Sequence, residues 1–260
     1  MRDLLYPEDH AWRGGDEAVD RARASQKRPL PKRFYKDVAV EAGEGGHLVT
    51  LDGRKARTPG KSLLKLPTRA AANVVAAEWA AQGEVIDPAE MHATRIANVG
   101  IDRVEAVRAE VIAEIVRYAG SDLVCYRADG PEGLIEREST AWDPVLRHAR
   151  DVHGARFVLS QGIGHAEQPE AALAAVEAAF AAVADPVALA ALHTLTTLSG
   201  SALIVLMLRD GALAAEAAFL ASSVEEDWNV HLWGEDGEAT LRRARRRQEF
   251  LAAAALLKAL

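Results

Sequence analysis

The chain has 260 residues, of which 49% are hydrophobic and 27% are charged, so it can bury a core and is not disordered overall. Its formal net charge of −7 argues against a general nucleic-acid binder, because such proteins are usually basic. A single cysteine, Cys125, excludes an intrachain disulfide and a cysteine-rich zinc site.

The N-terminal stretch has none of the usual features of a targeting signal. MRDLLYPEDHAWRGG carries acidic residues and Pro7 where a secretory signal peptide needs an apolar segment. It also lacks the arginine-rich, acid-poor composition of a mitochondrial transit peptide. We therefore expect a cytoplasmic protein of bacterial type, with the mitochondrial matrix as the equivalent compartment in a eukaryote. Residues 1–30 are polar and predict a loose N-terminal arm.

Residues 31–67 predict a small antiparallel β domain. The stretch KRFYKDVAVEAG alternates apolar and polar residues, and a second strand, HLVTLDGR, follows the turn GEGG. Asp52-Gly53 is a strong hairpin signal, because these residue types accept the positive φ angles of a tight turn. Short extended pieces bounded by Pro59 and Pro67 complete the predicted domain.

Residues 68–260 predict a larger, all-helical domain, which makes the expected fold class α+β. After Pro67 the spacing of apolar residues changes from about 2 to about 3.6 residues. Thr68 is the expected N-cap of a helix that stops near Gly83. Further helices are expected over residues 94–118 with a break near Gly100, 134–154 with a kink or restart at Asp143-Pro144, 168–184, 187–208 interrupted near Gly200, 212–233 and 238–260.

The most apolar segment, residues 187–208, is about as long as a membrane span. It contains His193, three threonines and the sequence Ser199-Gly200-Ser201. Because so many polar groups are costly in lipid, we predict buried core helices and no stable membrane insertion. His193 is expected to be a hydrogen-bonded core histidine.

Known catalytic and cofactor patterns are not met. Gly53 to Ser62 has six residues between its first and second glycine, whereas a phosphate-binding loop needs four. Cys125 is flanked by apolar residues, which favours a buried side chain over a nucleophile. His148 and His153 are five residues apart and are not expected to share a helical face. We predict no catalytic residue, no cofactor and no metal site.

Two charged segments near the C-terminus are candidate functional surfaces. Arg242–Arg247, with the sequence RRARRR, predicts a solvated face of the last helix, a contact for an acidic protein surface, or an RNA or membrane adaptor. In the acidic segment Glu225–Glu238, Glu225, Trp228 and Leu232 share a helical face. That segment is interpreted as a recognition surface, as a capped helix end, or as the acids of a hydrolase or transferase.

Several motifs in a fixed order resemble one protein family. From about Arg33 to Asp236 the chain contains RFYKDVAV, LDGRKARTP, AAEWAAQ, IDPAEM, SDLVCYRA, WDPVL, SGS and EEDWNVHLWGED. In order and spacing they resemble the ATP synthase F(1) assembly chaperones for the α subunit, the ATP-twelve type. Trp79 and the motif Trp142-Asp143-Pro144 match this pattern and are expected to be chiefly structural.

The resemblance implies a chaperone that needs no ATP, no cofactor and no catalysis. It implies that the protein holds the unassembled α subunit of the ATP synthase and prevents its aggregation before the α/β hexamer forms. The absence of long heptad repeats predicts a monomer. The partner-binding residues that the resemblance implies are Glu225, Glu226, Asp227, Trp228 and Gly234.

Overall fold

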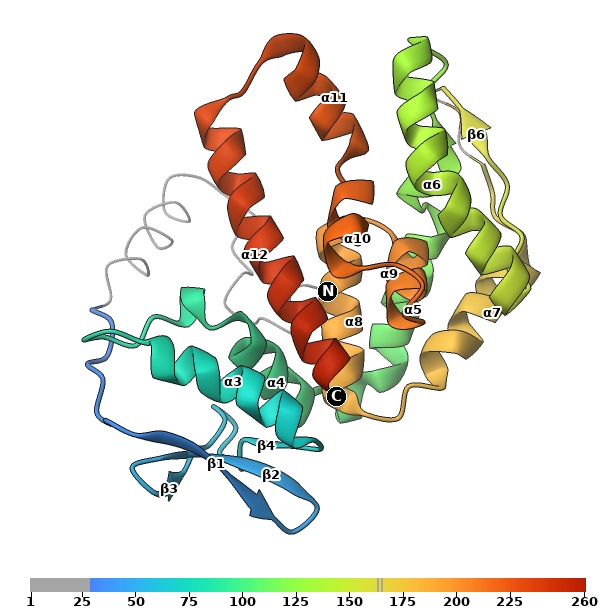
Figure 1. Ribbon diagram of the computed structural model, residues 1–260. Helices are drawn as coiled ribbons and strands as arrows, with labels where there is room; N and C mark the ends of the chain where they lie inside the picture. Colours follow the sequence, from blue (N-terminus) through green and yellow to red (C-terminus); the bar gives the residue numbers. More distant parts are fainter. Residues whose placement is uncertain (1–28, 163, 165) are drawn as a thin grey trace, which may run out of the picture. The chain divides into compact units, whose positions relative to one another are not determined.

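The computed structural model describes residues 29–162, 164 and 166–260 and confirms the α+β class, with antiparallel strands first and helices after them (Figure 1). The described chain forms two compact units that divide between Ala106 and Val107. The predicted arm over residues 1–30 lies almost entirely outside the described residues. The predicted boundaries of the β domain and the helical domain stay predictions.

A small sheet centred on β2 forms the base of the first unit. β2 pairs antiparallel with β1, β3 and β4. Asp52 and Gly53 join β2 to β3 with φ angles of 48° and 73°, which confirms the predicted hairpin. The strands are β1 (Val38–Gly43), β2 (Gly46–Leu51), β3 (Arg54–Lys55) and β4 (Lys65–Leu66).

Helix α3 (Arg69–Ala81) packs on β1 and β2. As predicted, Thr68 is its N-cap: the hydroxyl oxygen accepts a hydrogen bond from the Ala71 N–H at 3.0 Å. The Glu78 carboxylate in turn accepts bonds from the first N–H groups of the next helix, α4 (His92–Asp102), at 2.7 Å. A side chain of α3 therefore fixes where α4 begins.

The predicted break in the segment 94–118 is present, but it does not lie at Gly100 itself. Gly100 is buried inside α4, and the interruption comes later, at Arg103 and the 3₁₀ turn Val104–Val107. A helix tolerates an interior glycine at a modest cost. A second 3₁₀ turn, Pro88–Glu90, precedes α4.

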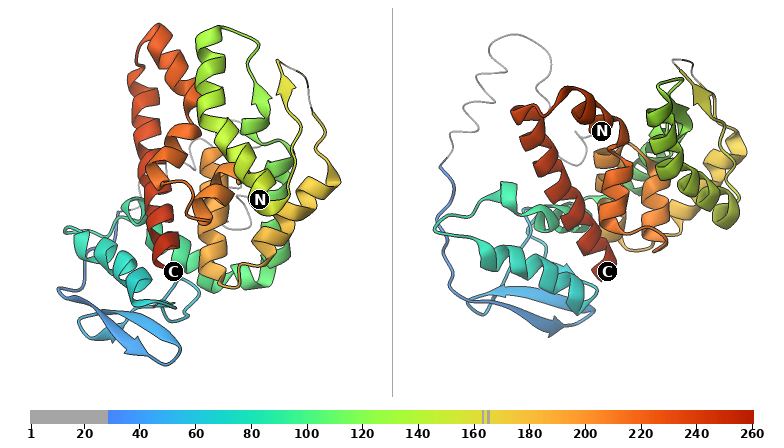
Figure 2. Two further views of the ribbon diagram at one scale, coloured as in Figure 1. Left: turned by 45° about the vertical axis from the view of Figure 1, so that its right-hand side comes forward. Right: turned by 45° about the horizontal axis from the view of Figure 1, so that its top comes forward.

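The second unit is helical and is built around α8. Almost every residue of α8 is buried, and it packs against α5, α9 and α12 (Figures 1 and 2). Its elements are α5 (Arg108–Gly120), the 3₁₀ turn Leu123–Cys125, β5 (Tyr126–Arg127), α6 (Glu132–His153), β6 (Ser160–Gln161), α7 (Glu170–Ala181), α8 (Pro186–Ser199), α9 (Ala202–Arg209), α10 (Ala215–Ala221), α11 (Val224–Trp233) and α12 (Gly237–Ala259).

The apolar segment 187–208 folds as two buried helices, as predicted. Gly200 has a φ of 71° and ends α8, and the Ser201 hydroxyl caps α9 by accepting a bond from the Ile204 N–H at 3.0 Å. The buried Asp122 carboxylate accepts a further bond from the Leu203 N–H at 3.0 Å. No helix in the described part of the chain combines the length and the apolarity that crossing a membrane requires.

The helix predicted over residues 134–154 does not restart at Asp143-Pro144: α6 runs unbroken through Pro144, and Trp142 and Val145 on either side of the proline are buried. The alternative, a kink at this position, stays a prediction. Another predicted helix boundary is wrong. The segment 212–233 is two helices instead of one. Ser222 and Ser223 separate them, and both hydroxyls donate to the Phe219 carbonyl, at 2.7 and 3.1 Å. Such side-chain bonds compete with helix continuation.

The structural role expected for Trp142 is confirmed. Its side chain is fully buried, and its indole N–H donates to the Ala221 carbonyl at 2.7 Å, at the end of α10. This bond ties α6 to the place where α10 stops and α11 begins.

His193 lies buried in α8, as expected for a core histidine. The hydrogen bonding expected of this histidine is not found at Nε2, which has no partner among the described residues. Burial lowers the pKa of His193 to about 4, although the charge of Glu114 acts in the opposite direction.

Replacing His193 by leucine tests this environment. In the unfolded chain a histidine has a pKa of about 6.5, so between pH 7 and 5 only the unfolded state takes up the proton and the folded state loses stability. Between pH 7 and pH 5 the free energy of unfolding of His193→Leu should therefore fall by about 2 kcal/mol less than that of the wild type. Urea denaturation at each pH measures both values. Buried Asp122, whose pKa is raised to about 6, stabilises the folded state as the pH falls. This effect is the same in both proteins and cancels in the comparison. An identical pH dependence of the two proteins would contradict the prediction.

Candidate partner-binding surface

The two charged segments singled out in the sequence meet in the fold. Helices α11 and α12 run in opposite directions on either side of a turn (Figure 1). Across them Glu226 pairs with Arg246 and Asp227 pairs with Arg243. The acidic segment and the arginine cluster are therefore one paired structure and not two separate surfaces.

Almost the whole arginine cluster is neutralised internally. In addition to the two pairs across α11, Arg247 pairs with Glu216 of α10 at 2.7 Å, and Arg242 pairs with Glu238 one turn away at 2.5 Å. A cluster whose charge is balanced in this way gives little net attraction for the phosphates of RNA or of an anionic membrane. The geometry thus gives no support to an RNA or membrane adaptor.

Within α11 the predicted site residues have different roles. Glu225 is exposed and forms no ion pair among the described residues. Trp228 is half-buried against α6: the guanidinium of Arg137 lies 5.0 Å from its ring centroid, and a Cβ on Gly133 would come within 3.0 Å of the ring. Gly234 ends the helix with a φ of 84°. Trp228 and Gly234 position α11, whereas Glu225 faces solvent.

A buried acid on α6 belongs to the same region and was missed in the sequence. Glu138 is fully buried, and one of its carboxylate oxygens accepts a bond from the Ala128 N–H at 2.9 Å, while the other has no partner among the described residues. Burial raises the pKa of Glu138, and the negative charge of Glu225 acts in the same direction. No sequence pattern distinguishes this glutamate from the exposed ones around it.

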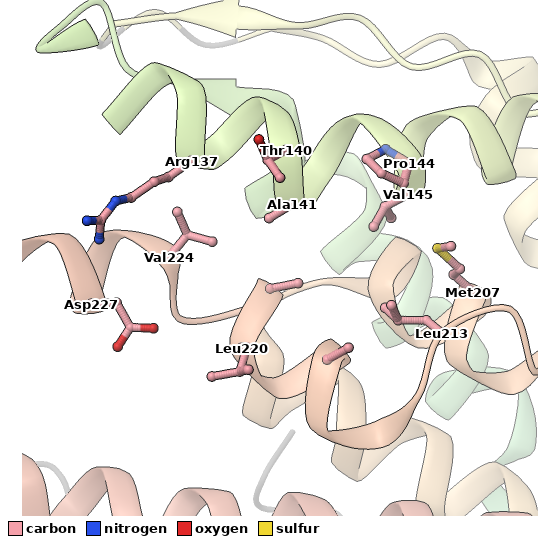
Figure 3. Close-up of a pocket in the computed structure, with 12 residues that line it drawn as sticks. Arg137, Thr140, Ala141, Pro144, Val145, Met207, Leu213, Leu220, Val224 and Asp227 are labelled. Carbon is pink, nitrogen blue, oxygen red and sulfur yellow. The ribbon is translucent and has the colours of Figure 1, made fainter. Parts of the chain in front are cut away.

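An apolar cavity of about 460 Å³ opens between α6, α9, α10 and α11. Figure 3 shows Arg137 and Asp227 near one end of it and Met207 and Leu213 near the other. The charged groups thus mark one end of a largely apolar hollow. Its lining residues are Arg137, Thr140, Ala141, Pro144, Val145, Met207, Leu213, Ala217, Leu220, Ala221, Val224 and Asp227.

Large apolar side chains are exposed on the same helices. Leu220 of α10 is 48% exposed and also lines the cavity. Leu232 and Trp233 at the end of α11 are 49% and 78% exposed, and Leu241 of α12 is 62% exposed. Exposed large apolar side chains such as Leu220 beside an apolar hollow are typical of a protein-interaction surface.

This arrangement fits recognition better than acid–base catalysis. A catalytic pair of acids needs a concave site that holds the reacting groups close together. Here Glu226 and Asp227 are engaged by arginines, Glu225 is exposed, and the cavity wall carries a single carboxylate, that of Asp227. A hollow that is mostly apolar with a charged end is suited to an apolar side chain flanked by a polar or basic group.

Comparisons with known proteins agree with one another. Residues 32–150 match the family described as ATP12 chaperone protein. The structure is similar to the Atu1473 protein of Agrobacterium tumefaciens, with a TM-score of 0.84 and 44% identity over 100% of this chain and 97% of that one. It is also similar to Atp12 of Paracoccus denitrificans, with a TM-score of 0.81 and 37% identity over 88% of this chain and 98% of that one. A mutant of the Paracoccus protein gives the same TM-score and identity.

The ion pair between α11 and α12 can be tested by exchanging its charges. Asp227→Lys places two cations side by side and should lower the free energy of unfolding by up to about 1 kcal/mol, since both side chains are partly exposed. The double variant Asp227→Lys with Arg243→Glu should recover most of that loss, measured by urea denaturation. Glu177→Lys, the same charge reversal at an exposed position of α7, is the control and should leave stability unchanged. A double variant no more stable than Asp227→Lys would show that this pair does not hold the helices together.

Proposed function

We propose that this chain, which belongs to the ATP12 chaperone protein family, is an ATP-independent chaperone that binds the unassembled α subunit of F-type ATP synthase. In this role it promotes assembly of the catalytic α/β head. The likeness to Paracoccus denitrificans Atp12, at 37% identity over 98% of that chain, is the observation that supports the family's role for this protein.

The proposed binding surface is α11 together with the apolar cavity beside it. An unassembled subunit exposes the apolar face that it later buries against its neighbour, and such faces aggregate. The cavity and the exposed Leu220 offer an apolar counterpart, while Glu225 offers an unpaired negative charge. The proposed partner-binding residues are Glu225, Glu226, Asp227, Trp228 and Gly234.

Within this surface the proposal assigns different tasks. Glu225 contacts the partner directly, and Asp227 contacts it at the charged end of the cavity. Glu226 contributes through its pair with Arg246, which holds α11 in place. Trp228 and Gly234 act by fixing the position and the end of the helix.

Release without ATP follows from an order of affinities. The chaperone must bind the α subunit more tightly than α subunits bind one another, and less tightly than the β subunit does in the assembled head. The incoming β subunit then displaces it by competition. The proposal places this exchange in the bacterial cytoplasm and requires only a monomer.

Co-purification tests the proposed partner. The chain is mixed with separately expressed α and β subunits of the ATP synthase from the same organism, and the retained subunit is identified. Retention of α and not of β is the expected result. Retention of neither subunit, with both shown to be soluble, would contradict the proposal. Retention of β alone would show that the proposal names the wrong partner.

Charge reversal at Glu225 tests the proposed surface. Glu225→Lys combined with Leu220→Asp removes the unpaired acid and adds a charge at the cavity wall, so we expect α-subunit binding to weaken by about tenfold or more. The thermal unfolding midpoint should change little, because both side chains are exposed.

The matched control is Glu177→Lys, the same charge change at an exposed position of α7. It should bind the α subunit as the wild type does. If both variants bind equally well, α11 is not the contact surface, even where the co-purification has confirmed the partner.

A further inference from the structure

A compact cluster of two histidines and one aspartate lies away from the proposed partner contacts. His148 and His153 come from the C-terminal part of α6, and Asp210 follows the last residue of α9. The Nε2 atoms of the two histidines lie 2.8 and 2.5 Å from the same carboxylate oxygen, Oδ2 of Asp210. Their ligand atoms all lie within 4.8 Å of one another, and no other such group of three occurs in the described part of the chain.

The expectation that the two histidines would not share a helical face is wrong. Their ring centroids are 5.6 Å apart, because both side chains turn toward the Asp210 carboxylate. The three side chains are only 11%, 14% and 18% exposed, so the rings are largely withdrawn from solvent. The five-residue spacing argued against a joint site, and it could not reveal a carboxylate from a distant part of the sequence.

The surroundings orient the aspartate for a further ligand. Arg209 binds the other carboxylate oxygen, Oδ1, through Nε at 3.0 Å and Nη2 at 2.8 Å. Its Nη1 donates to the Ala179 carbonyl at 2.6 Å, which fixes the guanidinium on that side. Oδ2 is thereby left facing the imidazoles. Partners of this kind orient the ligating groups of metal sites.

The position in the fold also favours a cation. His153 lies in the last turn of α6, and Asp210 is the C-cap of α9. The C-terminal end of a helix carries partial negative charge from carbonyl groups that lack intrahelical partners. Two such ends converge here, together with the formal charge of Asp210, and offset the positive charge of Arg209.

We propose that His148, His153 and Asp210 bind a divalent transition-metal ion of the zinc type. Imidazole nitrogen and carboxylate oxygen are common zinc ligands, and three protein ligands leave a fourth position for water. Around an ion with bonds of about 2.1 Å, tetrahedral ligand atoms lie about 3.4 Å apart. The two nitrogen–oxygen distances would therefore need to open by less than about 1 Å, which rotation of these side chains supplies.

Such an ion would link α6 to the connection between α9 and α10. Met207 and Leu213, on either side of Asp210 in the sequence, both line the apolar cavity, as does Pro144 of α6. Metal binding would thus hold two walls of the cavity together at the end that lies away from Arg137 and Asp227 (Figure 3). The metal site itself does not depend on the proposed chaperone function.

The test uses the full chain without an affinity tag, stripped with a chelator and then titrated with zinc chloride. We expect saturable binding of one zinc ion per chain and a higher thermal unfolding midpoint with zinc present. His153→Gln and Asp210→Asn should each lower the zinc affinity by about 100-fold or more. His231→Gln, at an exposed histidine of α11, is the control and should bind zinc as the wild type does.

A second measurement needs no variant and guards against misfolding. Histidines of the wild-type chain are modified with diethyl pyrocarbonate and mapped by mass spectrometry, with and without zinc. Zinc should protect His148 and His153 and leave His231 reactive. The absence of a saturable site, wild-type affinity in both ligand variants, or equal modification of His148 and His153 with and without zinc would each overturn the proposal.

Discussion

The burial of α8 is the constraint on which the rest of the second unit depends. A helix with almost no exposed face must be covered on all sides, and α5, α9 and α12 supply that cover. The hydroxyls of Thr194, Thr196 and Ser199 are satisfied within the helix: they donate to carbonyls four residues earlier, at 2.8 to 2.9 Å. Helix α8 can therefore bury these polar groups and still form the centre of the second unit.

The helix that carries the proposed contacts is held by a different kind of interaction. In α11 only Val224 is buried, and charge pairs to α12 and the packing of Trp228 on α6 fix its position. Partly exposed ion pairs contribute little stability each, so α11 is among the less firmly held elements of this unit. A surface that must bind and then release a partner is well served by an element of that kind, because it can adjust without disturbing the core.

Local signals in the sequence predicted the fold where local chemistry decides it. The Thr68 cap, the Asp52-Gly53 turn and the interruption at Gly200 each depend on residues next to one another in the chain. The site could be predicted only in part. The sequence identified the acids and the arginines but not that they pair, and the spacing of His148 and His153 argued against a joint site because it could not show the carboxylate between them. These contacts join residues 16 to 62 positions apart, and no short-range pattern encodes them.

The pairing of acids with arginines has a consequence for the proposed exchange with the β subunit. A basic group on the partner that approaches Glu226 or Asp227 must compete with Arg246 or Arg243, so part of the attraction it gains replaces an attraction already present. Glu225 has no such competitor among the described residues. The net gain per contact is therefore smaller than the number of charges implies, and most of the affinity must come from apolar groups that enter the cavity. Binding of this kind is specific in orientation and moderate in strength, and release by competition requires both properties.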